Sequence, residues 1–435
     1  MTLLSKHGFA VGFVVVLLAG VALRVYHLDV EPAPNDTADE FAWTWSGMTL
    51  LSQGTPTAWS WLPVYGDVPV TEWRGNRYRL VTPYLDHPPL YSVFMGAWMR
   101  AWGSREILSV DLAVMRRSSV VLFTVLMGAM AWALRQHLSQ SATLLALLLM
   151  ATAPPAVLQQ RLVISENLWT PLTLVAYALL ATDARKPSRW SLAGLVFCAA
   201  ALPLAKVAAL ASSFFLMVAA LSRGSRRLVL AVGGGTVLGV LLYLVYGYAV
   251  GGDLFVEVLR SQSDRFRGLG GFYSLLFEPA VVTDAVHYMP FVLGVVASIA
   301  LCLRSRPVEW ALPVLCYAAA MAYFMNQGEV YGWYFLPLYP WLAAATADLC
   351  VRAWRLRRPH LLWVFSLFVS IGVLTTLQDL ELADLQTVRY VFLACLLGGT
   401  GMLWMPVWGK RLVAPVSVLS LIALVATNVL GVLAR

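Results

Sequence analysis

The chain has 435 residues, of which 60% are hydrophobic and 12% are charged, and its mean hydropathy is +0.72. This composition excludes an ordinary soluble domain, because such domains carry about 25% charged residues. The formal net charge of +8 is not a sign of nucleic-acid binding, because the basic residues gather in short loops between apolar runs, as they do in membrane proteins.

Apolar runs long enough to cross a membrane follow one another along most of the chain, since a helical span needs about 20 apolar residues. Residues 8–28 are expected to be a retained first helix and not a cleaved signal peptide, because Arg24 and Tyr26 stand where cleavage would need small residues. With this helix we predict thirteen spans in a single all-α, polytopic membrane domain covering residues 1–435, the last three forming a C-terminal group at 360–433. The other twelve are expected at 111–134, 142–160, 167–182, 190–203, 205–221, 228–248, 284–303, 308–326, 333–351, 360–377, 389–409 and 412–433.

The short loops predict the orientation of these spans. One set of loops holds 16 of the 31 basic residues but three of the 23 acidic ones, which gives this face a net charge of about +13 against about −5 for the other face. The positive-inside rule places the first face in the cytoplasm. The long loops 29–110 and 249–283 are then extracytoplasmic, and we expect the protein in a bacterial-type plasma (inner) membrane.

The 29–110 loop is predicted to carry two helices that lie in the membrane interface. Thr37 to Gly54 shows apolar residues at three- and four-residue spacing and ends at a glycine. Pro88 to Trp102 is apolar and aromatic but too short to span a bilayer. Between them, Gly75 to Arg79 is expected to be an exposed turn.

Two features of the sequence are expected to have no catalytic or ligand-binding role. The five cysteines lie inside apolar runs and form no CxxC pair, so we expect buried thiols and neither disulfides nor a structural zinc site. The glycines at 268–271 in the second long loop lack the strand-to-helix context of a phosphate-binding loop.

Ionisable residues gather at one depth, at the extracytoplasmic ends of the predicted spans. Such residues are unfavourable near lipid unless they are hydrated or paired. The acids that open the first interfacial helix could act as helix caps, with Thr37 or Asp36 accepting the free amide hydrogens. Capping does not explain why so many other ionisable groups share this depth, so we expect several to converge on one cavity. The full set is Asp36, Asp39, Glu40, Asp86, His87, Arg161, Glu166, Lys206, Arg265 and Arg267.

These residue types suit the transfer of a group from a phosphate leaving group to a hydroxyl. A carboxylate can remove the hydroxyl proton, and Arg or Lys can neutralise the charge that develops on the phosphate. The sequence contains no nucleotide-binding βαβ unit and no glycine-rich phosphate fingerprint. A lipid-borne phosphosugar is therefore favoured over a nucleotide sugar.

The two motifs of the first loop resemble those of the polytopic GT-C superfamily of glycosyltransferases. The likeness is to the bacterial protein mannosyltransferase-like group, which includes the aminoarabinose transferases. Its members carry a DE pair followed by two leucines and a glycine, as in Asp39-Glu40 through to Gly54. They then carry a KPPL- or HPPL-like string leading into a short amphipathic helix, as in His87-Pro88-Pro89-Leu90.

The resemblance continues over about residues 8–350. The acid that opens a helix is matched by Glu166, the helix lysine by Lys206, and the later "RF.G" string by Arg265, Phe266 and Gly268. Residues 334–343, YFLPLYPWLA, resemble the group's "YLLPLLP.LA" helix. Two departures stand out: His87 replaces the common lysine before Pro-Pro, and the segment before residue 334 offers Glu329 where many members have a base.

The resemblance implies an inverting transfer of a sugar from a polyprenyl-phosphate carrier to an acceptor hydroxyl on a lipid, polysaccharide or protein, at the extracytoplasmic face. Asp39 would be the general base, with Glu40 as second choice or structural partner. Glu166 would orient the acceptor or help to bind a metal. The resemblance allows but does not require a divalent cation, Mg²⁺ or Mn²⁺. The residues implied in binding the donor phosphate are His87, Lys206, Arg265 and, more weakly, Arg161.

Other functions also need a hydrated, charged cavity within a membrane. A transporter or flippase of lipid-linked sugars is one alternative, although transporters usually show repeated halves, and this sequence shows no internal repeat. A polysaccharide ligase or polymerase that uses the same carrier lipids is another. A purely structural membrane protein would not need the embedded acids.

Overall fold

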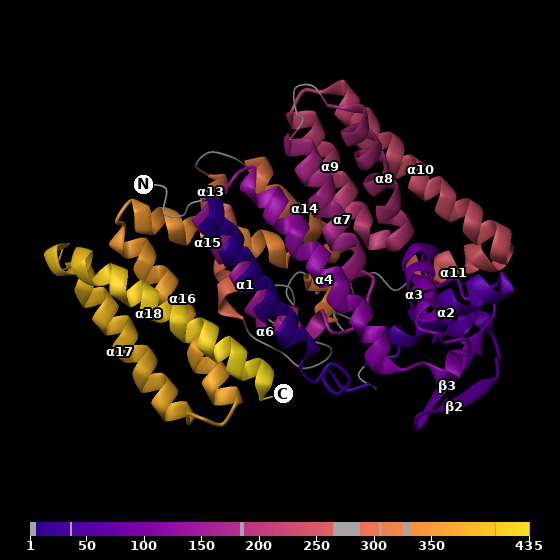
Figure 1. The fold of residues 1–435 in the computed structure, drawn as a ribbon, viewed down its shortest axis with the longest axis horizontal. Helices are drawn as coiled ribbons and strands as arrows, with labels where there is room; N and C mark the ends of the chain where they lie inside the picture. Colours follow the sequence, from indigo (N-terminus) through magenta and orange to yellow (C-terminus); the bar gives the residue numbers. More distant parts are fainter. Residues whose placement is uncertain are drawn as a thin grey trace.

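The computed structural model describes residues 6–34, 37–182, 187–263, 288–303, 307–324, 331–404 and 406–434. Each of the thirteen predicted ranges overlaps a longer described helix (Figure 1). These helices are α1 (Lys6–Val25), α4 (Leu112–Arg135), α5 (Gln140–Thr152), α7 (Glu166–Thr182), α8 (Arg189–Ala205), α9 (Leu210–Ser222), α10 (Arg226–Gly251), α13 (Met289–Cys302), α14 (Pro307–Phe324), α15 (Tyr339–Arg355), α16 (Pro359–Asp379), α17 (Leu385–Trp404) and α18 (Pro406–Leu433).

Five stretches of helix in the described part of the chain are long and apolar enough to cross a membrane by themselves. They are His7–Val25, Leu112–Arg135, Arg226–Gly251, His360–Gln378 and Pro415–Leu433. Shorter apolar helices such as α5, α8 and α13 accompany them. The number of thirteen crossings therefore stays a prediction.

Prolines explain where the helices depart from the predicted ranges. The expected span 142–160 is two helices, because α5 stops before Pro154 and the short α6 (Pro154–Gln159) begins there. A residue that precedes proline is disfavoured in the helical conformation. Similarly, the range 333–351 starts with a 3-10 turn, η4 (Gly332–Phe335), and α15 begins only at Tyr339, with Pro340 in its first turn.

The 29–110 segment contains both predicted helices, α2 (Asp39–Gln53) and α3 (Pro89–Ala101). It also contains strands, so the expectation of an all-α chain is wrong here. The strands β1 (Ala58–Trp59), β2 (Val70–Trp73) and β3 (Asn76–Val81) form an antiparallel sheet in the order β1–β3–β2. Of the turn expected at Gly75 to Arg79, only Gly75 lies in a turn, and the other residues belong to β3. In this strand Tyr78 is buried, whereas its neighbours Arg77 and Arg79 are exposed and partly exposed.

Glycines let two pairs of helices approach closely. A side chain at Gly47 of α2 would overlap the Ser92 carbonyl of α3, and one at Gly96 of α3 would overlap the Gly47 backbone. The hydroxyl of Ser46 donates a hydrogen bond to that of Ser92 at 2.8 Å beside this crossing. Gly235 and Gly239 of α10 meet the α8 backbone in the same way, as small residues spaced by four commonly do between membrane helices.

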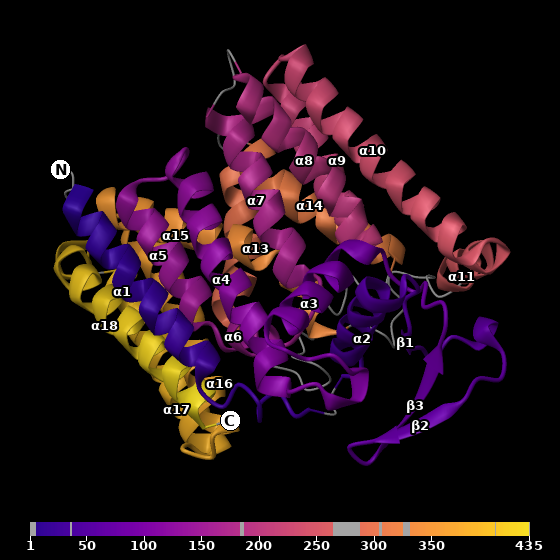
Figure 2. The same cartoon turned by 45° about the vertical axis from the view of Figure 1, so that its right-hand side comes forward.

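The helices α2 and α3, the sheet and the short helix α11 (Asp253–Ser263) gather at one end of the bundle (Figures 1 and 2). The turn between α9 and α10 lies at the other end of α10. The second predicted loop, 249–283, starts as the end of α10 followed by α11, and its part from residue 264 lies outside the described residues. The α3 helix packs against α2, α4 and α8, which brings the 29–110 segment onto the helix that ends at Lys206. The α4 helix in turn packs against α7, which begins at Glu166.

Candidate active site

Glu40 is the centre of a buried ion pair. Its carboxylate accepts hydrogen bonds from Arg116 of α4 at 2.7 and 2.9 Å, one to each oxygen, and a further one from the amide of Val163 at 2.9 Å. Arg116 also donates to the carbonyls of Leu28 and Pro32. Both charged side chains are fully buried. The Glu40–Arg116 pair thus joins α2 and α4 to each other and to two loops. This geometry favours a structural role for Glu40 over proton transfer.

Asp39 precedes Glu40 but occupies a different environment. It is half-buried in the first turn of α2, and its amide donates to the hydroxyl of Thr37 at 3.2 Å. Burial raises the pKa of Tyr84 well above its ordinary value, and the carboxylates of Asp86 and then Asp39 add to this shift. Asp39 therefore lies close to the phenol of Tyr84, at a partly accessible position where a substrate proton could reach it.

His87 lies flat against Trp43 of α2. The ring centroids are 4.2 Å apart with an interplanar angle of 12°, and the ring of Tyr84 meets His87 edge-on at 6.1 Å. The residue that replaces the expected lysine is thus held by an aromatic stack. This stack places a half-buried imidazole one helical turn along α2 from Asp39.

Asp86 is fixed by two hydroxyl groups from the loop before it. Ser60 donates to one carboxylate oxygen at 2.6 Å, and Tyr65 donates to the other at 2.7 Å. Burial and the nearby Asp86 raise the pKa of Tyr65 well above its ordinary value, so this phenol stays protonated and remains a donor. These hydrogen bonds hold Asp86 in place and thereby help to position the next residue, His87.

Lys206 and Glu166 form a second ionisable cluster. The lysine follows the end of α8 with an extended backbone, and its Nζ lies 2.5 Å from Glu166 Oε1 at the start of α7. Nζ also lies 4.6 Å from the ring centre of Tyr334. Glu166 is almost fully buried, whereas the Lys206 side chain is 13% exposed. The ammonium group is therefore held in place yet is open to a ligand.

Tyr91 lies between the two clusters. Its ring meets Trp43 edge-on at 5.3 Å, on the side of the site that holds His87. Burial raises the pKa of this phenol well above its ordinary value, and the carboxylates of Glu40 and Glu166 raise it further. Since both carboxylates act on the same phenol, the structure brings the DE pair and the Glu166–Lys206 pair to one region.

An apolar cavity of about 410 Å³ lies among α13, α14 and the start of α15. It extends along α13 from Tyr288 to Leu303, a length of roughly 20 Å at the helical rise of 1.5 Å per residue. Phe335, which directly follows Tyr334, forms part of its wall. Other lining residues are Phe291, Val295, Ile299, Val314, Ala318, Leu338 and Leu342.

Of the two remaining arginines predicted to bind the donor phosphate, the structure describes Arg161 and not Arg265. Arg161 is buried and donates to the carbonyls of Leu23 and Glu31 at 2.7 and 3.2 Å, so it secures the end of α1. Burial and the neighbouring Arg116 lower its pKa to about 10. These contacts favour a structural role over phosphate binding. Arg265, Arg267 and Asp36 lie outside the described residues.

Glu166 is not assembled into a metal site with other described residues. Within the ranges that the structure describes, no three His, Cys, Asp or Glu side chains gather to hold an ion. The carboxylate of Glu166 is instead bound by Lys206 and by the hydroxyl of Ser165. These contacts favour a role for Glu166 in holding the lysine.

Sequence reasoning missed Arg116 and the aromatic partners of His87. An arginine inside an apolar span was the available signal for Arg116, since a charge there needs a partner. The signal for Trp43 was weaker, because its distance in sequence from His87 does not reveal that α2 and α3 pack together.

No protein-family model matches the sequence, and no curated protein matches it. The fold is similar to that of ArnT from Cupriavidus metallidurans bound to undecaprenyl phosphate, with a TM-score of 0.58 at 15% identity, covering 99% of this chain and 77% of ArnT. ArnT in the apo state gives a TM-score of 0.57 at 15% identity, covering 98% and 77%. For the apo oligosaccharyltransferase of Archaeoglobus fulgidus the TM-score is 0.49 at 13% identity, covering 98% and 57%.

At this level of identity the likeness shows the fold alone: the course of this chain follows that of ArnT over nearly its whole length. The predicted type of fold agrees with this likeness, and the number of thirteen spans stays a prediction. Together with the long apolar helices, the fold identifies an integral membrane protein.

Proposed function

We propose that this protein is an inverting glycosyltransferase that moves a sugar from a polyprenyl-phosphate carrier to an acceptor hydroxyl at the extracytoplasmic face of a bacterial-type plasma membrane. The observation that carries the proposal is a held ammonium group, Lys206, beside Tyr334, together with an apolar cavity about 20 Å long whose wall includes the next residue, Phe335. An anionic headgroup joined to an apolar chain is the kind of molecule that would use both features. The undecaprenyl phosphate bound to ArnT is of this kind.

Asp39 would act as the general base. Its carboxylate takes the proton of the acceptor hydroxyl, and the hydroxyl oxygen forms a bond to the anomeric carbon from the face opposite the phosphate. The bond between that carbon and the phosphate oxygen breaks, and its electron pair leaves on the polyprenyl phosphate. The configuration of the anomeric carbon is inverted.

Cations stabilise the leaving phosphate. The donor is a phosphodiester with one negative charge, and the product is a monoester that gains a second, so a cation beside it stabilises the transition state more than the ground state. Lys206 fills this role, with His87 and Arg265 as further candidates. Glu166 holds the lysine in place.

The test compares Lys206→Ala with Arg352→Ala in detergent, using a donor labelled in the polyprenyl chain and measuring free polyprenyl phosphate. The wild type should release it, whereas a transporter should not. Lys206→Ala should lower the rate by about an order of magnitude or more. Arg352 is half-exposed and pairs with Asp348 at 2.8 Å, far along the sequence from the proposed site, so its variant should keep the rate. Equal rates in folded samples of both variants would move the phosphate site elsewhere.

A further inference from the structure

The helix α4 has one exposed stripe on an otherwise buried surface. The exposed residues recur every three or four positions, as one face of a helix does, and they are Arg117, Val121, Val125, Gly128, Trp132 and Arg135. The two arginines that bound the stripe are separated by roughly 27 Å along the helix, close to the hydrocarbon thickness of about 30 Å. The stripe therefore faces lipid, and Arg117 marks one edge of the hydrocarbon layer.

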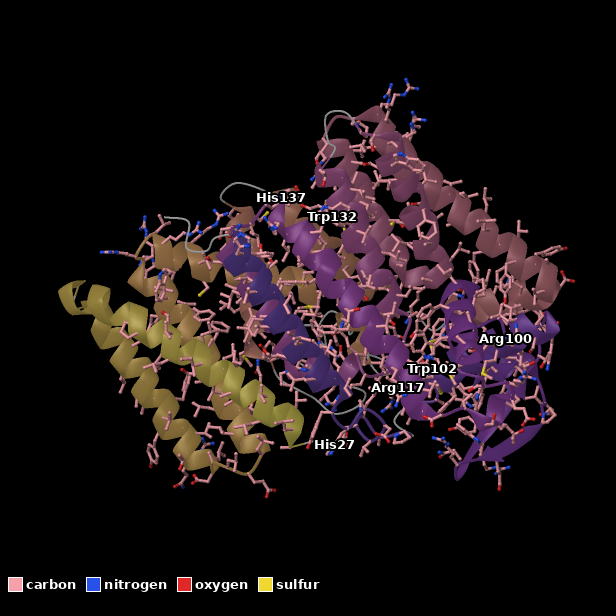
Figure 3. All side chains as sticks on the ribbon, viewed as in Figure 1. His27, Arg100, Trp102, Arg117, Trp132 and His137 are labelled. Atoms are coloured by element: carbon pink, nitrogen blue, oxygen red, sulfur yellow. The ribbon has the colours of Figure 1, made fainter. Side chains whose placement is uncertain are left out.

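An exposed tryptophan lies beside Arg117. The guanidinium carbon of Arg117 is 5.8 Å from the ring centre of Trp102, which is 54% exposed. Trp98 lies 5.9 Å from Trp102, and its indole N–H donates to the carbonyl of Val114 in α4 at 2.8 Å. Figure 3 shows Trp102 and Arg117 together at the beginning of α4, with Trp132 towards its other end. Tryptophan and arginine at this depth are typical of contact with lipid headgroups.

The last turn of α3 and the residues after it add positive charge to this corner. Arg100 and Arg105 line a cavity of about 410 Å³ together with Ser52 and Ser104. Arg100 donates to the carbonyl of Leu51, which fixes it at the cavity wall. The acids near this turn are Glu106, which is exposed, and Asp111, whose carboxylate accepts from the amide of Val114 as the cap of α4.

We propose that this corner between α3 and α4 binds an anionic phospholipid of the outer leaflet. The phosphate lies at Arg117 beside Trp102, which stands between Arg100 and Arg105 in the sequence, and an acyl chain runs along Val121 and Val125. The charge selects an anionic over a zwitterionic lipid. The apolar stripe next to Arg117 favours a lipid over a soluble phosphate, because a soluble phosphate has no acyl chain to contact Val121 and Val125.

This site is separate from the proposed active site. Ser52 at the cavity and Asp39 at the active site lie near opposite ends of α2, roughly 20 Å apart along the helix. Arg117 points to the exposed side of α4, whereas its neighbour Arg116 is buried against Glu40. Lipid binding is therefore expected whether or not the protein transfers sugars.

Native mass spectrometry of the full-length protein in detergent tests the proposal, with phosphatidylglycerol and phosphatidylcholine as probes. Wild type should bind phosphatidylglycerol more tightly. Arg117→Gln should weaken that binding by about fivefold or more and leave phosphatidylcholine binding unchanged. Trp102→Ala, which keeps every charge, should weaken it as well. The matched control is Arg77→Gln, which removes the same charge from the protein. Arg77 is exposed on β3, opposite Glu72.

Three outcomes would overturn the proposal. Equal losses in Arg117→Gln and Arg77→Gln would mean a general effect of protein charge. Equal affinities of the wild type for the two lipids would remove the role of the anionic headgroup. Competition by free glycerol phosphate at the concentrations that suffice for the lipid would identify a site for soluble anions.

Discussion

The adjacent acids Asp39 and Glu40 lie in different environments although they are successive residues of α2. Successive residues on a helix point about 100° apart, so one side chain of the pair enters the protein while the other stays near the surface. Glu40 is fully buried and bound by Arg116, whereas Asp39 is half-buried near Tyr84. From the sequence, Asp39 was expected to be the base and Glu40 either a second choice or a structural partner. The sequence could not decide between these two roles of Glu40, because its partner Arg116 lies 76 positions away.

Arg116→Ala should strongly destabilise the protein. The change leaves the buried carboxylate of Glu40 without its counter-charge, and the loss of one partner of a buried ion pair costs about 3–5 kcal/mol. Arg117→Ala is the matched control, because this exposed neighbour should change the free energy of unfolding by less than about 1 kcal/mol. Thermal unfolding in detergent measures both. If the two variants unfold at the same temperature, the Glu40–Arg116 pair does not hold these helices together.

At the scale of elements, local patterns predicted the helices well. Both α2 and α3 were expected within two residues of their observed ends, because their apolar spacing, Pro88-Pro89 and Gly54 are all local signals. The sheet was missed because its strands are only two to six residues long and pair across turns. The break in the predicted span 142–160 was also missed, although Pro154 and Pro155 mark its position.

Gly96→Ala should disrupt the packing of α2 on α3. The added methyl group would overlap the Gly47 backbone, and a backbone cannot move aside as a flexible side chain can, so we expect a loss of about 1–3 kcal/mol or more. Gly128→Ala is the control in α4, where a methyl group would meet open space. That variant should be neutral or slightly more stable, since alanine favours a helix by up to about 1 kcal/mol. A similar unfolding temperature for both variants would contradict the close crossing.

At the scale of the whole molecule, the loops that were assigned to opposite faces by their charge lie at opposite ends of the bundle. The 29–110 segment and α11 gather at one end, and the turn between α9 and α10, with its arginines, lies away from them (Figure 2). How many helices cross the bilayer does not follow from hydropathy alone, because several helices here are shorter than the span of a bilayer.

The orientation can be measured by cysteine labelling. Thr71→Cys in β2 should react with a membrane-impermeant reagent in intact spheroplasts, because we place the 29–110 segment outside the cytoplasm. Leu356→Cys, at an exposed position among the arginines that follow α15, should react only after lysis. The wild type, with its own cysteines, gives the background. The opposite pattern would invert the topology and move the proposed active site to the cytoplasmic face.

The central claim is that Asp39 is the base for sugar transfer from a polyprenyl phosphate. The most direct measurement is the rate at which purified wild type and Asp39→Asn release polyprenyl phosphate from a labelled donor in the presence of acceptor. Asp39→Asn keeps the size of the side chain and leaves the Glu40–Arg116 pair intact, so the protein should unfold at an unchanged temperature. We predict a rate lowered by about 10²-fold or more, the effect expected for loss of a general base. A rate close to that of the wild type would contradict the assignment of Asp39 as the base.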